Sequence, residues 1–265
     1  MTARRFLPAG AVALALWPLY GFIGHRTRDA GPWGIVALAI VAAIVAARAR
    51  GSFAPSAPIL VLAAAALAAY ATLWGRVPTL IAAVPGVLSL GIALLFALPP
   101  AERARGFALP ILAVFVLPAG PSVDMLLGYP LRVASVHLAA ETLSLGGLDA
   151  SPRGASIMLG GRQVFVDPAC SGAKMLHAAL LCAVALSAIH GCRPRAILAS
   201  CAAAVALSVL GNAWRSGALA IAEVRMAGGV PALLHEGVGL LAFAVLASVL
   251  AAGHARAGRW VPCAA

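Results

Sequence analysis

The chain alternates between long apolar runs and short polar segments that hold most of its charged residues. A helix that crosses a bilayer needs about 20 predominantly apolar residues. Eight runs come close to this length, so the pattern predicts an all-α polytopic membrane protein with about eight transmembrane helices. Their expected bounds are residues 6–24, 33–48, 57–75, 78–98, 106–123, 171–190, 196–215 and 231–252.

The second and fifth of these spans carry the weakest signal. Pro110 and Pro118 lie in the fifth, where proline kinks or shortens a helix. The first run follows Arg4 and Arg5, as the apolar region of a secretory signal peptide does. It is long for such a region, and no small-x-small site leads into a soluble domain, so a transmembrane helix is favoured.

Composition indicates that lipid is the main solvent of this chain. Of its 265 residues, 63% are apolar and 10% are charged, whereas soluble domains have about 45–50% and about 25%. The net charge of +11 comes from 19 basic residues that are dispersed between apolar runs. Because no basic stripe with interleaved aromatic residues is present, we expect membrane lipid and not nucleic acid as a partner.

The basic residues also predict the orientation, since cytoplasmic loops are enriched in Lys and Arg. With the N-terminus inside, ten of the 19 lie on short inner segments: Arg4, Arg5, Arg48, Arg50, Arg103, Arg105, Arg193, Arg195, Arg256 and Arg259. Four of the others lie in or beside one long outer loop, which counts little in this rule. Richness in Ala and Arg suggests a GC-rich bacterial genome, so we expect the bacterial inner membrane.

Residues 124–168 are expected to form a small extracytoplasmic cap. The pattern over 131–145 predicts an amphipathic helix. Two apolar, β-prone runs at 157–159 and 164–166 flank Gly160-Gly161, which predicts a β-hairpin. The cap would lead directly into the last three spans.

Cys170 follows Asp167-Pro168 and precedes a long apolar run. Asp at the N-cap and Pro at the first helical position are typical of a helix start. We therefore expect Cys170 in the first turn, where free N–H groups favour the thiolate, and Lys174 on the same face with the same effect. The alternative is a small buried residue, the usual role of cysteine on an apolar helix.

Arg215 and His235 are the other candidates for chemistry. Asn212 and Arg215 are three residues apart, on one face of a helix. Arg215 is either functional or an interfacial arginine that reaches the headgroups. His235 is either an acid or base near neutral pH or a hydrogen-bonded histidine of the helix interface.

A shared membrane depth favours the functional interpretation of all three residues. Cys170 lies 20 residues before His190, Arg215 lies 20 residues after Arg195, and His235 lies 19 residues before His254. At about 1.5 Å per helical residue, each separation is about 30 Å, the thickness of the hydrocarbon core. A nucleophile, a cation and an imidazole would thus meet at the outer interface.

Two alternatives stay open at this point. His177, two helical turns deeper than Cys170, could be the base, and Lys174 could be the important cation. The role of Glu236, beside His235, is left open. No paired His or Cys spacing typical of zinc is present, so neither a metal nor another cofactor is expected.

Three short motifs resemble the exosortase/archaeosortase family. Ala169-Cys170-Ser171-Gly172 is similar to its nucleophile motif, Asn212-x-x-Arg215 to its arginine motif, and His235-x-x-x-Gly239 to its histidine motif. The resemblance covers residues 105–250 in order. It divides the chain into four N-terminal spans (1–104) and a core (105–265) that holds the fifth span, the cap and three catalytic spans.

The resemblance implies a membrane cysteine transpeptidase. Such enzymes cleave exported proteins that carry a C-terminal motif, a transmembrane helix and a basic tail, and pass the acyl group to an acceptor, which is unknown here. It implies Cys170 as nucleophile, Arg215 as stabiliser of negative charge and His235 as acid and base, supported by Lys174, Asn212, Ser171 and Gly172. The competing functions are a transporter component and a non-catalytic scaffold.

Overall fold

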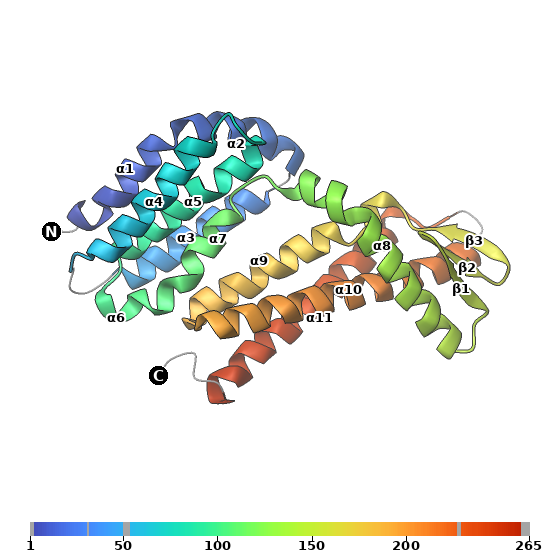
Figure 1. Ribbon diagram of the computed structural model, residues 1–265. Coiled ribbons are helices and arrows are strands. Elements are labelled where there is room, and N and C mark those ends of the chain that lie inside the picture. The colour runs from blue at the N-terminus through green and yellow to red at the C-terminus, as the bar shows by residue number, and fades with distance from the viewer. Residues whose placement is uncertain (1–2, 31, 50–53, 227–228, 261–265) are drawn as a thin grey trace. The chain divides into compact units, whose positions relative to one another are not determined.

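A computed structural model describes residues 3–30, 32–49, 54–226 and 229–260 of the chain, which are mainly helical (Figure 1). The α-helices are α1 (Leu7–Ala15), α2 (Trp17–Ala30), α3 (Trp33–Arg48), α4 (Ala57–Leu73), α5 (Thr79–Phe96), α6 (Pro100–Arg103), α7 (Ala108–Val114), α8 (Gly120–Leu145), α9 (Ala173–His190), α10 (Pro194–Arg225) and α11 (Ala232–Trp260). Short 3-10 helices are η1 (Ala3–Phe6), η2 (Arg105–Phe107) and η3 (Pro168–Cys170). Three strands, β1 (Ala150–Arg153), β2 (Ser156–Leu159) and β3 (Arg162–Phe165), form one sheet.

The elements form two compact units. The first comprises Met1–Ala119, Ala183–Ser200 and His254–Ala265, and the second comprises Gly120–Cys182 and Cys201–Gly253. All residues proposed above for chemistry belong to the second unit.

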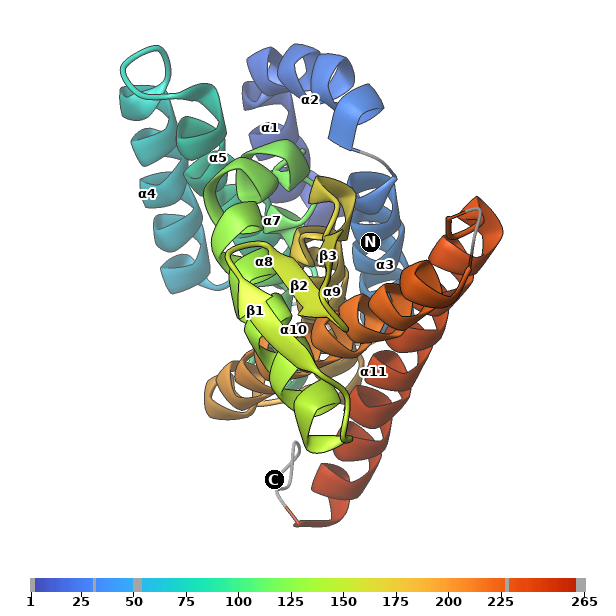
Figure 2. The ribbon, with the colours of Figure 1, turned by 90° about the vertical axis from the view of Figure 1, so that its right-hand side faces the viewer.

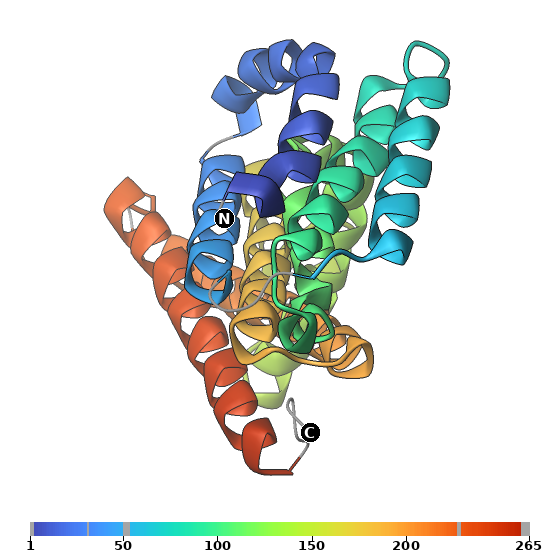
Figure 3. The same ribbon diagram turned by 90° about the vertical axis from the view of Figure 1, so that its left-hand side faces the viewer.

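The first unit is built around α5, which packs against α1, α4 and α7. Figure 3 shows α4 and α5 side by side. The buried Ser89 hydroxyl on α5 donates to the Ala63 carbonyl on α4 at 2.7 Å. Gly91 allows α7 to approach closely, since a Cβ there would lie 2.5 Å from Cα of Pro110. Small residues thus let these apolar helices pack tightly.

The predicted spans are reproduced to different degrees. Among the residues that the structure describes, four helices are long and apolar enough to cross a membrane, or five if the bent pair described below is one span. The four are Thr79–Phe96, Ala173–His190, Pro194–Arg225 and Ala232–Arg256. The windows of the last two are only 28% and 22% buried, so most of their apolar surface is left for lipid. The second and third expected spans form shorter apolar helices, Trp33–Arg48 and Ala57–Leu73. A multi-pass protein is supported, but the count of eight spans is not confirmed.

The first expected span is not one straight helix. Arg4–Ala15 and Trp17–Arg26 are bent by 68° relative to each other. Pro18, near the start of the second piece, has no N–H to donate to the preceding turn, which accounts for the break.

The fifth expected span is also divided. The helix α7 ends at Val114, and Pro118 lies in the break before α8 begins at Gly120. Pro110 falls in the first turn of α7, where the missing N–H would have no helical partner. Pro118 has no N–H to donate to the preceding turn, and its ring disfavours the helical conformation of the residue before it. The helix α7 therefore ends before Pro118.

The cap is larger than predicted. Its helix, α8, begins at Gly120 rather than Leu131, with Pro121 at a position that favours helix initiation. The hairpin of β2 and β3 is confirmed, and both glycines of its turn have positive φ, at 56° and 75°. In addition, β1 pairs antiparallel with β2, and its four residues lie opposite Leu159 through Ser156. Figure 2 shows the sheet lying on α8, and Ile157 and Leu159 of the sheet belong to the same buried apolar cluster as Val136 and Ala140 of the helix.

The expected position of Cys170 is wrong in one respect. Cys170 ends the 3-10 turn η3, and α9 begins three residues later at Ala173. The break lies at Gly172, whose φ of +86° is compatible with glycine but not with a right-handed helix. Cys170 is therefore outside the long apolar helix rather than in its first turn.

Candidate active site

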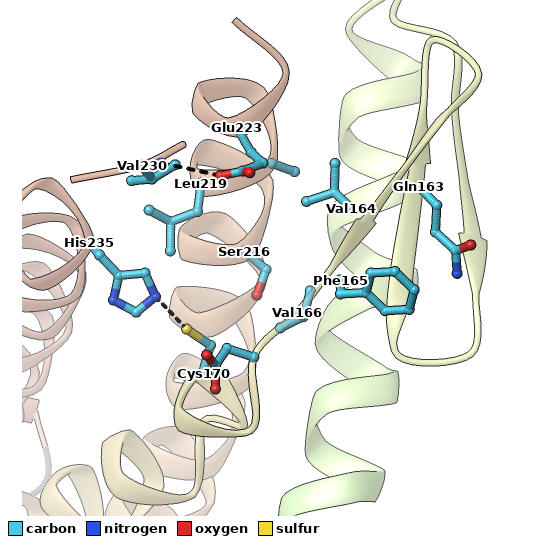
Figure 4. A pocket seen from close by; sticks show the side chains of 12 residues that line it. Gln163, Val164, Phe165, Val166, Cys170, Ser216, Leu219, Glu223, Val230 and His235 are labelled. Atoms are coloured by element: carbon cyan, nitrogen blue, oxygen red, sulfur yellow. Dashed lines mark hydrogen bonds between the residues drawn. The ribbon is translucent and has the colours of Figure 1, made fainter. Parts of the chain in front are cut away.

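Cys170 and His235 are in direct contact. Cys170 is held at the end of η3, where its N–H donates to the Asp167 carbonyl at 2.8 Å. His235 lies in the first turn of α11, and its Nε2 is 2.8 Å from the Cys170 Sγ. Figure 4 shows the two side chains directed at one another. A thiol and an imidazole are thus within hydrogen-bonding reach of each other.

Arg215 contacts the other nitrogen of the same imidazole. Its Nη2 is 3.3 Å from Nδ1 of His235. Gly239 leaves space for the guanidinium, because a Cβ there would lie 3.1 Å from Nε and 3.2 Å from Cζ of Arg215. The spacing His235-x-x-x-Gly239 is therefore explained physically: one turn of α11 presents both the imidazole and the space that the arginine occupies.

Asn212 supports the backbone that carries the thiol. Its side chain is 1% exposed. Its Nδ2 donates to the carbonyl of Cys170 and to the hydroxyl of Ser135, both at 3.0 Å. Gly172 makes this contact possible, since a Cβ there would lie 2.9 Å from Nδ2 of Asn212. Asn212 and Gly172 therefore form one packed contact beneath Cys170.

Ser171 ties the same turn to the cap helix. Its hydroxyl donates to Oδ1 of Asp124 on α8 at 2.7 Å and accepts from the N–H of Ala173 at 3.3 Å. The second bond satisfies a free donor at the start of α9. Asp124 and Ser135 were not anticipated from the sequence, because each is far along the chain from its partner.

The electrostatics of Cys170 differ from the expectation. Burial raises the pKa of the Cys170 thiol above its usual value, the Arg215 cation lowers it, and the Asp167 anion raises it again. Lys174 is exposed and is not among the causes of the shift. The expected activation of the thiol by a helix terminus and Lys174 is therefore not found, because the helix is interrupted at Gly172 and the net shift of the Cys170 pKa is upward.

A cavity of about 360 Å³ opens on Cys170 and His235. Its walls come from β3, from α10 and from the residues that precede α11 (Figure 4). Ser216 and Glu223 on α10 line it and were not predicted, although Ser216 directly follows Arg215 in the sequence. The cavity gives the thiol access to a ligand although Cys170 itself is only 3% exposed.

The remaining candidates lie apart from this contact. The imidazole bonded to Cys170 is His235, whereas His177 is half-buried on α9 and Glu236 is exposed. Within the described residues, no group of three or more His, Cys, Asp or Glu could hold a metal ion. The arrangement is thus a thiol, an imidazole and a guanidinium beside a cavity, a set suited to acyl transfer.

Comparison with known proteins gives one family. No curated protein and no solved structure matches the chain. The sequence pattern that defines the transmembrane exosortases matches residues 24–252, which include all three motifs. This chain therefore belongs to the transmembrane exosortase family, a group of membrane proteins linked to the processing of sorting signals.

Proposed function

We propose that this protein is a cysteine transpeptidase of the bacterial inner membrane. The observation that carries the proposal is the contact of one imidazole with both partners, at 2.8 Å from Cys170 Sγ and 3.3 Å from Arg215 Nη2. Its substrates are exported proteins with a C-terminal motif, a transmembrane helix and a basic tail. Cys170 is the nucleophile, His235 the acid and base, and Arg215 the stabiliser of the oxyanion.

The hydrogen bonds suggest a resting state that is not yet active. A guanidinium only donates, so Nδ1 of His235 accepts from Arg215 and the ring proton resides on Nε2, facing the sulfur. The imidazole cannot take the thiol proton at Nε2 in this tautomer. The raised pKa of Cys170 likewise keeps the thiol protonated.

Substrate binding resolves both obstacles in this proposal. The scissile carbonyl oxygen of a bound substrate can accept the hydrogen bond that Arg215 otherwise gives to Nδ1, and this bond strengthens as negative charge develops on the oxygen during attack. Once Arg215 has left Nδ1, the imidazole can exchange its ring proton through water, losing it from Nε2 and gaining one at Nδ1. Nε2 can then accept the proton of Cys170 as the sulfur attacks. Movement of Arg215 would thus couple activation of the thiol to binding of the correct substrate.

The reaction then follows acyl transfer. The Cys170 sulfur attacks the carbonyl carbon, and the C–N bond breaks while His235 protonates the leaving amine. The product is a thioester between Cys170 and the exported protein. Attack by the acceptor nucleophile forms the new acyl bond and returns the sulfur as a thiol.

Contacts in the first unit support the proposed orientation. Arg48 donates to the carbonyl of Arg105 at 3.3 Å and to that of Ile189 at 2.8 Å, and lies 3.9 Å from Glu102. These residues come from three separate segments that the sequence places inside. Their association supports a common side of the membrane for all three, with Cys170 at the outer interface.

Reporter fusions test this topology. Fusions after residues 50 and 193 should give a cytoplasmic signal, and a fusion after 161 an extracytoplasmic one, because basic residues are retained inside. An extracytoplasmic signal at residue 193 would contradict the shared depth of the three side chains, and the proposed site with it.

The alternatives make different demands on Cys170. A transporter has its site near the bilayer midplane, whereas α9 begins just after Cys170 and His235 is in the first turn of α11. Arg215 lies inside α10, which continues to Arg225, and it reaches the imidazole of His235 from there. A scaffold would tolerate loss of the thiol. The direct contact of Cys170 with an imidazole favours the enzyme.

The decisive experiment measures the processing of an exported reporter that carries a motif, helix and basic tail from the same genome. In cells without a paralogue, Cys170→Ala should abolish processing, and Cys170→Ser should nearly do so because a hydroxyl is a far weaker acid. Arg215→Lys should fail, since lysine lacks the planar fork. His235→Ala should fail as well, and His177→Ala should not. Normal maturation of the reporter by the Cys170→Ala variant would rule out the enzyme and leave the scaffold function in its place.

A further inference from the structure

The backbone of β3 has one open edge. β3 is an outer strand of the sheet β1-β2-β3, and just beyond its end the N–H of Val166 donates to the carbonyl of Ala155 at 3.2 Å. Antiparallel pairs alternate between bonded and non-bonded positions. Counting back along β3 from this bonded pair, Gln163 and Phe165 fall at non-bonded positions. Their N–H and C=O groups therefore point away from β2. No other described strand or side chain is bonded to them.

The cavity beside Cys170 follows this edge. Residues 163–166 all line it in succession. Side chains of a strand alternate between its two faces, so a cavity lined by four consecutive residues lies along the edge of the strand and not on one face. The opposite wall is α10, with Leu219 and Ala220, and the cavity ends at Cys170 and His235 (Figure 4).

The α10 wall also offers an unused hydrogen-bonding group. Ser216 is 3% exposed, and its buried hydroxyl has no partner among the described residues. Buried polar groups without partners are uncommon and call for an explanation. Figure 4 shows the hydroxyl directed toward the end of the cavity where Cys170 lies.

From these observations we propose that the cavity binds a peptide as an extended strand, which pairs with the open edge of β3 and brings its scissile carbonyl to Cys170. The inference rests on the proposed function, because it takes Cys170 as the nucleophile, and it adds how the substrate is held. Main-chain bonds to Gln163 and Phe165 supply affinity, while alternate side chains of the peptide face the walls and supply specificity. The peptide also supplies a partner for Ser216.

A peptide probe tests this mode of binding without any knowledge of the natural substrate. The probe is acetyl-tetra-alanine chloromethyl ketone, incubated with the purified full chain. The Cys170 thiolate displaces chloride, so a C–S bond forms and a chloride ion leaves. Mass spectrometry gives the labelling rate, and chloroacetamide, which has no peptide chain, gives the reference rate for each variant.

The matched variants are Phe165→Pro and Phe165→Ala. Both remove the aromatic ring, but only proline removes the N–H at the open edge, a position where proline is tolerated in an outer strand. We expect peptide labelling relative to chloroacetamide to be about fivefold slower in Phe165→Pro than in Phe165→Ala, the loss that one hydrogen bond gives. A probe methylated on alternate amide nitrogens should label the parent chain about as slowly as the unmethylated probe labels Phe165→Pro.

The results separate this inference from the proposed function. Equal relative rates in the two variants, together with no effect of N-methylation, would overturn pairing with β3. So would a peptide probe that labels no faster than chloroacetamide. If labelling follows the expected pattern but the parent chain processes no exported reporter, strand pairing stands and the transpeptidase function fails.

Discussion

Gly172→Ala tests whether the break before α9 positions Cys170. Alanine at a φ of +86° costs about 1–2 kcal/mol. Its Cβ would also lie 2.9 Å from Nδ2 of Asn212, the atom that donates to Cys170 and Ser135 at 3.0 Å each. Losing both hydrogen bonds costs about 2 kcal/mol more. We therefore expect a total free-energy cost of about 3–4 kcal/mol. Part of it lowers the free energy of unfolding, and part is relieved when the turn moves and displaces the thiol.

Gly161→Ala is the matched control for this variant. Gly161 also has a positive φ, 75°, but a Cβ there meets nothing within 4 Å. Both variants should lower the thermal unfolding midpoint in detergent through backbone strain. Only Gly172→Ala should slow processing of the reporter, by about 100-fold if Cys170 shifts by about 1 Å. Equal processing by the two variants would refute the argument that Gly172 and Asn212 position the thiol.

Two further predictions concern Arg215. Removal of its charge in Arg215→Gln should raise the pKa of the Cys170 thiol further, so that labelling by chloroacetamide is slower at neutral pH and its profile moves to higher pH. Asp167→Asn should move the pH profile of labelling to lower pH, and Lys174→Gln should leave that profile in place. If Lys174→Gln shifted the profile as much as Arg215→Gln does, Arg215 would not be the cation that lowers the Cys170 pKa. Gly239→Ala should slow processing about tenfold by displacing the guanidinium, whose Nε would lie 3.1 Å from the new Cβ. Its thermal stability should not fall, because alanine favours a helix more than glycine does, and normal processing would show that the arginine adapts without cost.

Some features followed from the sequence because their physics is local. Apolar runs long enough for a bilayer identify α5, α9, α10 and α11 from hydropathy alone. The two glycines at 160 and 161 predict the hairpin, since a two-residue turn of this type needs positive φ at both positions. The fixed rise of a helix placed Cys170, Arg215 and His235 at one depth, and the structure brings the three side chains together.

Other features depend on partners that are distant in the chain, and only the tertiary structure decided them. The strand β1 contains Pro152, which argues against a strand until pairing with β2 leaves the proline at an outer edge. Helix-start residues before Cys170 predicted a continuous helix, but packing against Asn212, 40 residues further along the chain, favours the turn at Gly172. The pKa of Cys170 was predicted from its neighbours in sequence, yet burial, a property of the assembled fold, has the largest effect and the opposite sign.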